Sequence, residues 1–176
     1  DAFKFGKGLD LTGYEVGTEN PKSEAAVDAA LVSGSRPGLD GSNFVAVQQW
    51  THDLDHFESL PQDERDAIIG RRLSDNSEIT DAPASAHGKR TEQESFDPPA
   101  CVLRRSMPWA DANGEGLHFV AFGKTLDPFE VQLRRMAGEE DGIIDGLFRF
   151  SRPVSGSYFW CPPVRDGRLD LTALGL

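Results

Sequence analysis

The chain has 176 residues with a formal net charge of −11, and 38% of the residues are hydrophobic. This length suits one ordinary domain, and the apolar content, with 11 Phe and 3 Trp, is enough to build a core, which excludes wholesale disorder. Such an acidic surface repels phosphate groups, so we expect neither nucleic acid nor a membrane as a partner.

The first structural signal is the stretch GYEVGTENP at 13–21. Two glycines and an Asn-Pro pair constrain its backbone, which predicts a tight loop. A loop constrained in this way usually presents a polar side chain at its centre. Here the central residue is Val16, with Glu15 beside it.

Hydrophobic patterning predicts further elements along the chain. They are a strand over 42–50, helices over 51–60 and 61–72, an irregular segment over 73–99, strands over 100–109 and 116–123 joined as a hairpin, a helix over 126–138, a short helix over 142–150 and a last strand over 156–163. Strands broken by helices, with a hairpin between them, indicate an α+β domain with an antiparallel sheet. A ferredoxin-like (split βαβ) arrangement, with the helices packed on one face, fits best.

The segment 126–138 carries the clearest helix signal. We expect Asp127 to cap its N-terminus and Pro128 to be the first helical residue, with Gly138 ending the helix. Its apolar face is formed by Phe129, Leu133 and Met136.

His52 and His56 are four residues apart, a spacing that on one helix would stack both imidazoles for zinc binding. No cysteine or third histidine is nearby in the sequence, so the pair is better interpreted as part of a solvated helix. His118 lies on a predicted strand and is expected to be a surface or edge residue.

His87 lies at the end of the irregular segment, among small residues that leave room for a large flat ligand. A single histidine whose other nitrogen is held by a carboxylate is one way in which proteins bind haem iron. One histidine is not a motif, so the residues alone leave an ordinary loop histidine as the alternative.

Arg104 and Arg105 are adjacent on a predicted strand, so one of the two must face inward. A buried arginine needs an anionic partner. That partner could be a core carboxylate such as Asp145, or an anionic ligand or the charge that develops in a reaction. The spacing leaves both interpretations open.

Cys101 and Cys161 lie in apolar surroundings, which favours buried free thiols over a disulfide and therefore a reducing cytoplasm. No apolar run approaches the roughly 20 residues that span a bilayer, and the first residues lack the hydrophobic stretch of a signal peptide.

Six stretches, taken in order, resemble the dye-decolourising (DyP-type) haem peroxidases, and within them the bacterial B-type group. They are GYEVGTENP, SAHGKR, RRSMPW, GLHFVAFG, DGLFRFSRPVSGSYFWCPP and GRLDLTALGL. Members of that family are longer and consist of two ferredoxin-like halves. The resemblance implies that residues 1–176 form a single domain like the C-terminal, haem-binding half, and that the N-terminal ferredoxin-like half is absent from this chain.

In that family the histidine of a Ser/Ala-His-x-x-Arg motif binds the haem iron, so the resemblance implies that His87 is the proximal ligand of haem b. An aspartate before the RFxRPV motif accepts the other imidazole hydrogen, and Asp145 is the matching residue. Arg90, at the end of the histidine motif, is implied as a partner of a haem propionate. Gly88 stands where relatives usually carry a larger apolar residue.

On the distal side, the arginine that precedes the family's SMP motif corresponds to Arg104. Ser106 lies two residues on, on the same strand face, where some relatives carry Asn. Leu117 and Phe119 resemble the apolar lining of the distal pocket.

The family's loop reads Gly-x-x-Asp-Gly, and its aspartate is the distal acid–base group. Val16 takes that position here, and a valine cannot move a proton between the two oxygens of bound hydrogen peroxide. Glu15 is one residue away, and a fixed loop would aim it elsewhere. Gly17 and Thr18 follow in the same loop and are implied as haem contacts.

The resemblance therefore implies a haem peroxidase that uses hydrogen peroxide to oxidise aromatic or dye-like donors by one-electron steps, weakened by Val16. A haem-binding protein without real peroxidase activity, and a structural remnant that pairs with another chain, are the alternatives. For bulky donors, electrons could arrive through aromatic residues, although core packing is the more ordinary role of each: Trp50, Trp109, Trp160 and Tyr158. The resemblance further implies a homo-oligomer, and some relatives are cargo of protein nanocompartments.

Overall fold

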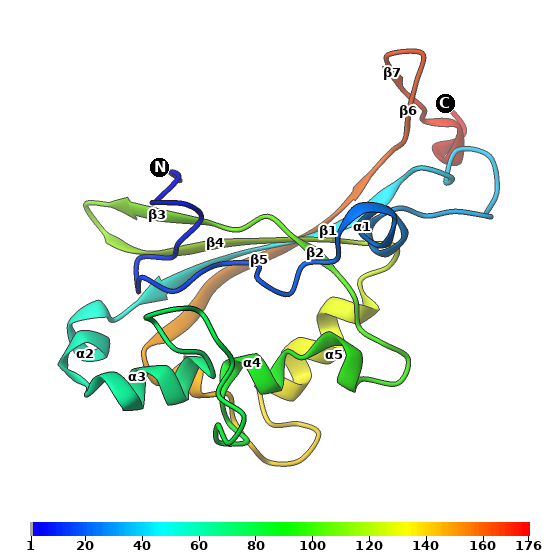
Figure 1. Cartoon of the computed structure of the whole chain (residues 1–176). Helices are drawn as coiled ribbons and strands as arrows, with labels where there is room; N and C mark the ends of the chain where they lie inside the picture. Colours follow the sequence, from blue (N-terminus) through cyan, green and yellow to red (C-terminus); the bar gives the residue numbers. More distant parts are fainter. Residues whose placement is uncertain (1) are drawn as a thin grey trace.

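The computed structural model describes residues 2–176, and its centre is one antiparallel sheet with helices along one face (Figure 1). Strand β1 lies between β4 and β5, and the short strands β2 and β3 both pair with the far side of β4. The bounds are β1 Asn43–His52, β2 Leu103–Arg104, β3 Met107–Asp111, β4 Gly114–Gly123 and β5 Ser151–Cys161. The prediction of an α+β domain with an antiparallel sheet is confirmed.

The helices that matter for the site lie beneath the sheet in Figure 1. They are α2 Leu54–Ser59, α3 Gln62–Ile69, α4 His87–Arg90, α5 Asp127–Met136 and the 3-10 turn η2 Gly146–Arg149. Outside this layer lie α1 Ser23–Ala30, the 3-10 turns η1 Gln93–Ser95 and η3 Thr172–Leu174, and the small hairpin β6 Val164–Arg165 with β7 Arg168–Leu169. The packing of helices on one face matches the expectation from the sequence.

Several predicted boundaries were wrong. Strand β1 continues through His52, so the helix expected over 51–60 begins only at Leu54. His52 and His56 therefore lie on different elements, and helical spacing does not apply to them. Helix α5 begins at Asp127 itself, with Leu126 as its N-cap, one residue earlier than expected.

The strand expected over 100–109 is split into β2 and β3. Arg104 pairs with Ala121 and Met107 with His118, so both pieces keep the same register on β4. Between them the Ser106 hydroxyl accepts the Val120 amide hydrogen at 3.3 Å. The Ser106 side chain thus accepts a hydrogen bond that a backbone carbonyl would accept in a regular antiparallel sheet.

Two apolar clusters hold the helices, one against the loop 13–21 and the segment before β5, and the other against the sheet. One consists of Tyr14, Phe57, Ile68 and Phe150, and the other of Ala46, Val102, Ala121 and Phe129. Burial of such side chains stabilises each contact by roughly 1.5–3 kcal/mol per large residue. The two clusters lie at different ends of the helical layer, and both contribute residues to the wall of one cavity. None of the helices in the described part of the chain is long and apolar enough to cross a membrane.

Candidate functional site

A cavity of about 500 Å³ opens between the sheet and the helices. Its volume falls within the roughly 300–1,000 Å³ of small-molecule and cofactor sites. The loop 13–21, strands β1, β2 and β4, and helices α4 and α5 all contribute to the wall. Most of the residues singled out from the sequence meet here.

His87 enters the cavity wall from the helical layer, as the first residue of α4. The end of α3 packs directly against this turn. Gly70 caps α3 in the left-handed conformation (φ 90°), and a Cβ at Gly70 would lie 3.3 Å from Ala86 Cβ. A Cβ at Gly88 would lie 3.3 Å from the Ile69 carbonyl oxygen. The small residues around His87 therefore permit a close helix contact that fixes its position.

The imidazole of His87 is oriented by Asp145. Its Nδ1 lies 2.8 Å from Asp145 Oδ2, while Asp145 Oδ1 accepts the Leu147 amide hydrogen at 2.8 Å and so caps η2. Asp145 is 1% exposed. Among residues 2–176, Nε2 of His87 has no hydrogen-bond partner, and the side chain retains 30% exposure towards the cavity. The arrangement leaves one ring nitrogen free to bind a ligand.

Backbone contacts hold Asp145 in place. The Gly146 amide donates to the Ser85 carbonyl at 2.6 Å, and the Asp145 amide donates to the Met136 carbonyl at 2.8 Å. A Cβ at Gly146 would lie 3.2 Å from the Ser85 oxygen, so a side chain at this position would crowd the approach. The short turn expected around Asp145 exists because its backbone is docked on two neighbours.

Arg104 enters the same cavity from the sheet, on β2. Its Nε is buried without a hydrogen-bond partner, and among the described residues no carboxylate lies within 4.0 Å of its guanidinium. Burial lowers the pKa of Arg104, and the nearby charges of Glu19 and Glu94 only partly offset this effect. Asp145 is thus not the partner of Arg104. Arg105 is exposed, so one arginine of the pair faces inward and the other outward, as the sequence predicted.

The loop 13–21 is attached to β2 through Asn20. The Asn20 side chain donates to the Arg104 carbonyl at 2.9 Å and accepts the Arg104 amide hydrogen at 2.8 Å. Gln93, 1% exposed, donates to the Glu19 carbonyl at 2.9 Å and accepts from Val102 at 2.6 Å. The sequence indicated a loop closed by Asn-Pro but gave no sign of these partners.

The other distal candidates also line the cavity: Val16, Gly17, Thr18, Ser106, Leu117 and Phe119. Gly17 has φ 71° and permits the turn of the loop, while the Val16 amide donates to the Gly8 carbonyl at 3.0 Å. Phe119 packs on Phe129 with ring centroids 5.8 Å apart. The structure brings these residues to the same cavity as His87 and Arg104.

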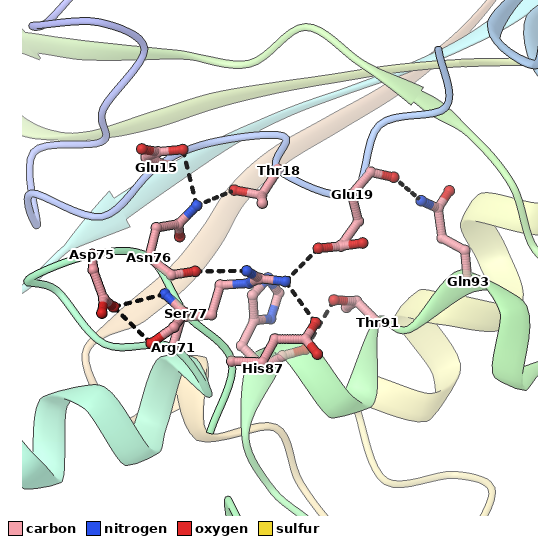
Figure 2. Close-up of polar contacts among 11 residues, drawn as sticks. Glu15, Thr18, Glu19, Arg71, Asp75, Asn76, Ser77, His87, Thr91 and Gln93 are labelled. Atoms are coloured by element: carbon pink, nitrogen blue, oxygen red, sulfur yellow. Dashed lines mark hydrogen bonds and ion pairs between the residues drawn. The ribbon is translucent and has the colours of Figure 1, made fainter. Parts of the chain in front are cut away.

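Figure 2 shows a polar cluster beside His87 that the sequence did not indicate. Arg71 Nη2 donates to Glu19 and, at 2.6 Å, to Glu78, while Nη1 donates to the Asn76 carbonyl at 2.8 Å. The Asn76 side chain donates to Glu15 at 2.9 Å and to Thr18 at 3.2 Å (Figure 2). These contacts join the loop 13–21 to the segment 71–78 along the cavity wall.

His52 also reaches the cavity wall, but both of its ring nitrogens have partners. Nδ1 lies 2.7 Å from the Ser151 hydroxyl, and Nε2 lies 3.4 Å from Asp10. Burial alone would raise the pKa of Asp10, but His52 and Thr12 lower it below its usual value. His52 therefore has no free nitrogen to offer a ligand.

Arg90 does not reach the cavity. It is 5% exposed, and its guanidinium donates to both oxygens of Asp141 at 2.7 and 2.8 Å and to the Arg135 carbonyl. These contacts join α4 to the end of α5, a structural role, and they leave the guanidinium turned away from a cavity-bound ligand. Arg90 therefore does not line the cavity in which we expected it to contact a haem propionate.

The remaining candidates lie elsewhere. His118 is half-buried against the Trp109 ring, with centroids 5.9 Å apart, so it is less exposed than expected. Cys101 and Cys161 are free, as predicted, but only partly buried. Across residues 2–176 no group of three or more His, Cys, Asp and Glu side chains is placed to hold a metal ion on its own.

Comparison with known proteins identifies what this chain resembles. The family described as "Dyp-type peroxidase, C-terminal" matches residues 7–166. The dye-decolorizing peroxidase of Rhodococcus erythropolis is 34% identical over 167 residues, which cover 91% of this chain and 49% of that protein. The dye-decolorizing peroxidase of Mycobacterium tuberculosis is 32% identical, with 92% and 50% covered.

Solved structures give the same result. A dye-decolorizing protein from V. cholerae superposes with a TM-score of 0.82 at 33% identity, covering 92% of this chain and 54% of that one. A variant of Rhodococcus jostii RHA1 DypB, solved in complex with heme, gives 0.85 at 30% identity, covering 96% and 57%. This chain thus spans about half the length of the curated relatives that it matches, and its fold is that of their ferredoxin-like C-terminal domain.

Proposed function

This chain belongs to the Dyp-type peroxidase family, and on that premise we propose that it is the haem-bearing part of a peroxidase that oxidises aromatic, dye-like donors with hydrogen peroxide. The observation that carries the proposal is the pairing of His87 and Arg104 on one cavity. Nε2 of His87 comes from the helical layer and Nε of Arg104 from the sheet, and neither has a hydrogen-bond partner among residues 2–176.

The residues present fit haem b. His87 offers the imidazole donor that haem iron takes, and the Asp145 carboxylate fixes the ring and increases its donor strength. Gly88 places no side chain beside the ligating ring. Leu117, Phe119 and Phe129 supply an apolar wall for a flat macrocycle. The buried Nε of Arg104, without a partner in the described chain, is the kind of atom that an anionic ligand satisfies.

Haem held by His87 would supply the iron on which hydrogen peroxide is cleaved and through which donors give up single electrons. The protein's own part is to hold charge and to move protons. Arg104 would stabilise negative charge on the departing oxygen of peroxide, because a largely buried guanidinium interacts with such charge more strongly than one surrounded by water. Ser106, on the same wall, would hold a water that carries the proton.

Val16 is the reason to propose a weakened enzyme. It lines the cavity where the family's acid–base aspartate is expected, and its side chain accepts no proton. Glu15, on the same loop, accepts a hydrogen bond from the Asn76 side chain. Loss of one general acid–base group lowers a rate by roughly 10²–10⁴-fold.

The donors would be aromatic molecules, some of them too large for the cavity. Tyr158 on β5 is 48% exposed. Its ring packs against Phe129, with centroids 5.8 Å apart, and Phe129 lines the cavity. Trp50, also on the cavity wall, and Trp109 are buried in the core. Tyr158 therefore combines surface access with a short aromatic path, which the two buried tryptophans do not.

The test is peroxide-dependent oxidation of a dye by this chain reconstituted with haemin. We expect measurable turnover, reduced about 10²–10³-fold in Arg104→Leu with little change in the haem spectrum. A wild-type chain that binds haemin but oxidises no donor would contradict the peroxidase. That outcome would support the second candidate, a haem-binding protein without turnover, which Val16 favours.

Three further statements accompany this proposal. Residues 1–176 would act as one domain, equivalent to the haem-bearing half of a longer peroxidase, which the match to a C-terminal family over residues 7–166 supports. The protein would assemble as a homo-oligomer, and it would work in the cytoplasm. The two free cysteines support the last statement.

A further inference from the structure

Tyrosine and tryptophan are side chains that can give up a single electron, and two of them line the cavity, Tyr14 and Trp50. The chain has two tyrosines and three tryptophans, and the other three do not line this wall. Trp50 donates its Nε1 hydrogen to the Gln48 side-chain oxygen at 3.0 Å, and a neutral amide is a very weak base. Tyr14 instead donates its hydroxyl hydrogen to Asp66 Oδ1 at 2.5 Å. Of the two, Tyr14 therefore has a carboxylate in contact with the hydrogen that it would lose.

Asp66 is buried on α3, yet it is kept ionised. It is 8% exposed, and its Oδ1 also accepts hydrogens from the Gln62 side chain at 2.6 Å and from the Leu73 amide at 3.1 Å. Burial alone would raise the pKa of Asp66, but these hydrogen bonds, with that from Tyr14, bring it below its usual value. The carboxylate is therefore charged at neutral pH and can accept a proton.

Tyr14 is shielded from bulk water. It is 5% exposed, and its ring packs edge-on against Phe57, with centroids 6.2 Å apart, in the apolar cluster that also holds Ile68 and Phe150. Burial and the Asp66 carboxylate raise the pKa of Tyr14, so the phenol is neutral at pH 7. Loss of an electron alone would leave a positive charge on this buried ring, which is costly. The proton must therefore leave together with the electron, and the hydrogen bond to Asp66 gives it a path.

The pair can keep its geometry when the proton moves. Gln62 Nε2 donates to the Tyr14 hydroxyl oxygen at 3.1 Å as well as to Asp66. After the transfer, Asp66 would donate and the Tyr14 oxygen would accept in the same hydrogen bond, and Gln62 would still donate to both. The charge of the pair would change from −1 to zero, because the electron is lost and the proton stays. No new buried charge is created, so the large cost of an unpaired internal charge does not arise.

We propose that Tyr14 is a redox-active residue, which gives one electron to the cavity-bound cofactor once peroxide has oxidised it, while Asp66 takes the phenolic proton. The inference rests on the proposed function, which supplies hydrogen peroxide as the oxidant. Peroxide takes up two electrons and two protons from solvent and leaves as two waters. Tyr14 supplies one of these electrons and the cofactor supplies the other. The O–H bond of Tyr14 breaks, which leaves a neutral tyrosyl radical beside a protonated Asp66. A donor that returns the electron lets Asp66 return the proton.

The test is electron paramagnetic resonance of the haemin-loaded chain, frozen at set times after mixing with peroxide in the absence of a donor. We expect a tyrosyl radical in wild type, identified by the narrowing of its signal when the protein contains ring-deuterated tyrosine. Tyr14→Phe should abolish this signal. Tyr158→Phe, which removes the only other tyrosine of the chain, is the matched control and should keep it. Asp66→Asn should slow radical formation roughly 10²–10⁴-fold, the range for loss of one general base, because an amide does not take the proton.

The haemin absorption spectrum of each variant shows whether its cavity still forms. A second measurement needs no variant: the wild-type radical should show coupling to an exchangeable proton, lost in heavy water, because its oxygen stays hydrogen-bonded. A tyrosyl signal that survives in Tyr14→Phe, or no such signal in a wild-type chain that consumes peroxide, would overturn the role of Tyr14. Equal rates in wild type and Asp66→Asn, or a radical without the exchangeable coupling, would contradict the role of Asp66. A wild-type chain that does not bind haemin or react with peroxide would instead refute the proposed function, and the redox role with it.

Discussion

At the scale of single residues, the site depends on which histidine has a free nitrogen. His52 and His87 both line the cavity, but His52 is bound on both sides, by Ser151 and Asp10. His87 is bound only at Nδ1, by Asp145. A neutral imidazole binds a metal through an unprotonated nitrogen, and a carboxylate on the other nitrogen fixes the tautomer. Both histidines line the same cavity, and their hydrogen bonds show which of them has a free nitrogen.

Val16→Asp is the residue-scale prediction. A carboxylate at position 16 would restore the proton transfer that valine cannot perform, so the rate of peroxide cleavage by the haemin-loaded chain should rise roughly 10²–10⁴-fold. Stopped-flow absorption after mixing with peroxide measures this rate. Val16→Asn, similar in size but without a basic oxygen, is the control and should remain slow. Equal rates for wild type and Val16→Asp would show that the weakening does not come from position 16.

At the scale of elements, the loop 13–21 is a fixed part of the scaffold. Tyr14 donates its hydroxyl hydrogen to Asp66 on α3, Asn20 holds the backbone of β2, and Asn76 holds Glu15 and Thr18. Burial alone would raise the pKa of Asp66, but hydrogen bonds from Tyr14, Gln62 and the Leu73 amide lower it below its usual value. Burial and the Asp66 carboxylate raise the pKa of Tyr14.

Tyr14→Phe should therefore destabilise the fold in a pH-dependent way. A lowered pKa of Asp66 contributes stability above the unfolded value near 4, and this contribution is lost as the pH falls through the folded value. We expect Tyr14→Phe to cost about 1–3 kcal/mol at pH 7 and clearly less below pH ~4. Urea denaturation of both proteins across this pH range measures the difference. A cost that stays constant with pH would show that Tyr14 acts by packing alone.

The sequence predicted the elements that carry a periodic signal. Helix α5 and the hairpin of β3 and β4 were anticipated because their apolar residues repeat at helical or strand spacing. Helix α4, a single turn of four residues, is too short to show any period, and it lay inside a segment expected to be irregular. Helix α1 was missed because half of its sequence, SEAAVDAA, is alanine, so it shows no repeat of large apolar residues, and it buries only Ala30.

The functional site could also be predicted only in part. The residues alone made His87 a candidate and required one of Arg104 and Arg105 to face inward, and the family resemblance then selected His87 and Arg104. The contacts that arrange them could not be predicted. Arg71 and Glu19 are 52 positions apart, and Asn20 and Arg104 are 84 apart, so only the fold shows that they meet. Arg90 was assigned to the cavity by its motif, but Asp141 binds it elsewhere.

At the scale of the whole molecule, the cavity depends on both layers at once. His87 belongs to the helices and Arg104 to the sheet, and the apolar cluster of Ala46, Val102, Ala121 and Phe129 holds α5 against the sheet. A ligand bound between them contacts the folded chain only. It should therefore stabilise folding by an amount that grows with its concentration relative to its dissociation constant.

The most direct measurement of the central claim is absorption titration of His87→Gly with haemin, with and without free imidazole. We predict that wild type binds one haemin per chain with the spectrum of an imidazole-ligated iron. His87→Gly should lose that spectrum and recover it when imidazole is added, because glycine leaves a gap of the right shape beside Asp145. An unchanged spectrum in His87→Gly without imidazole, or its loss in His52→Gln instead, would contradict the account.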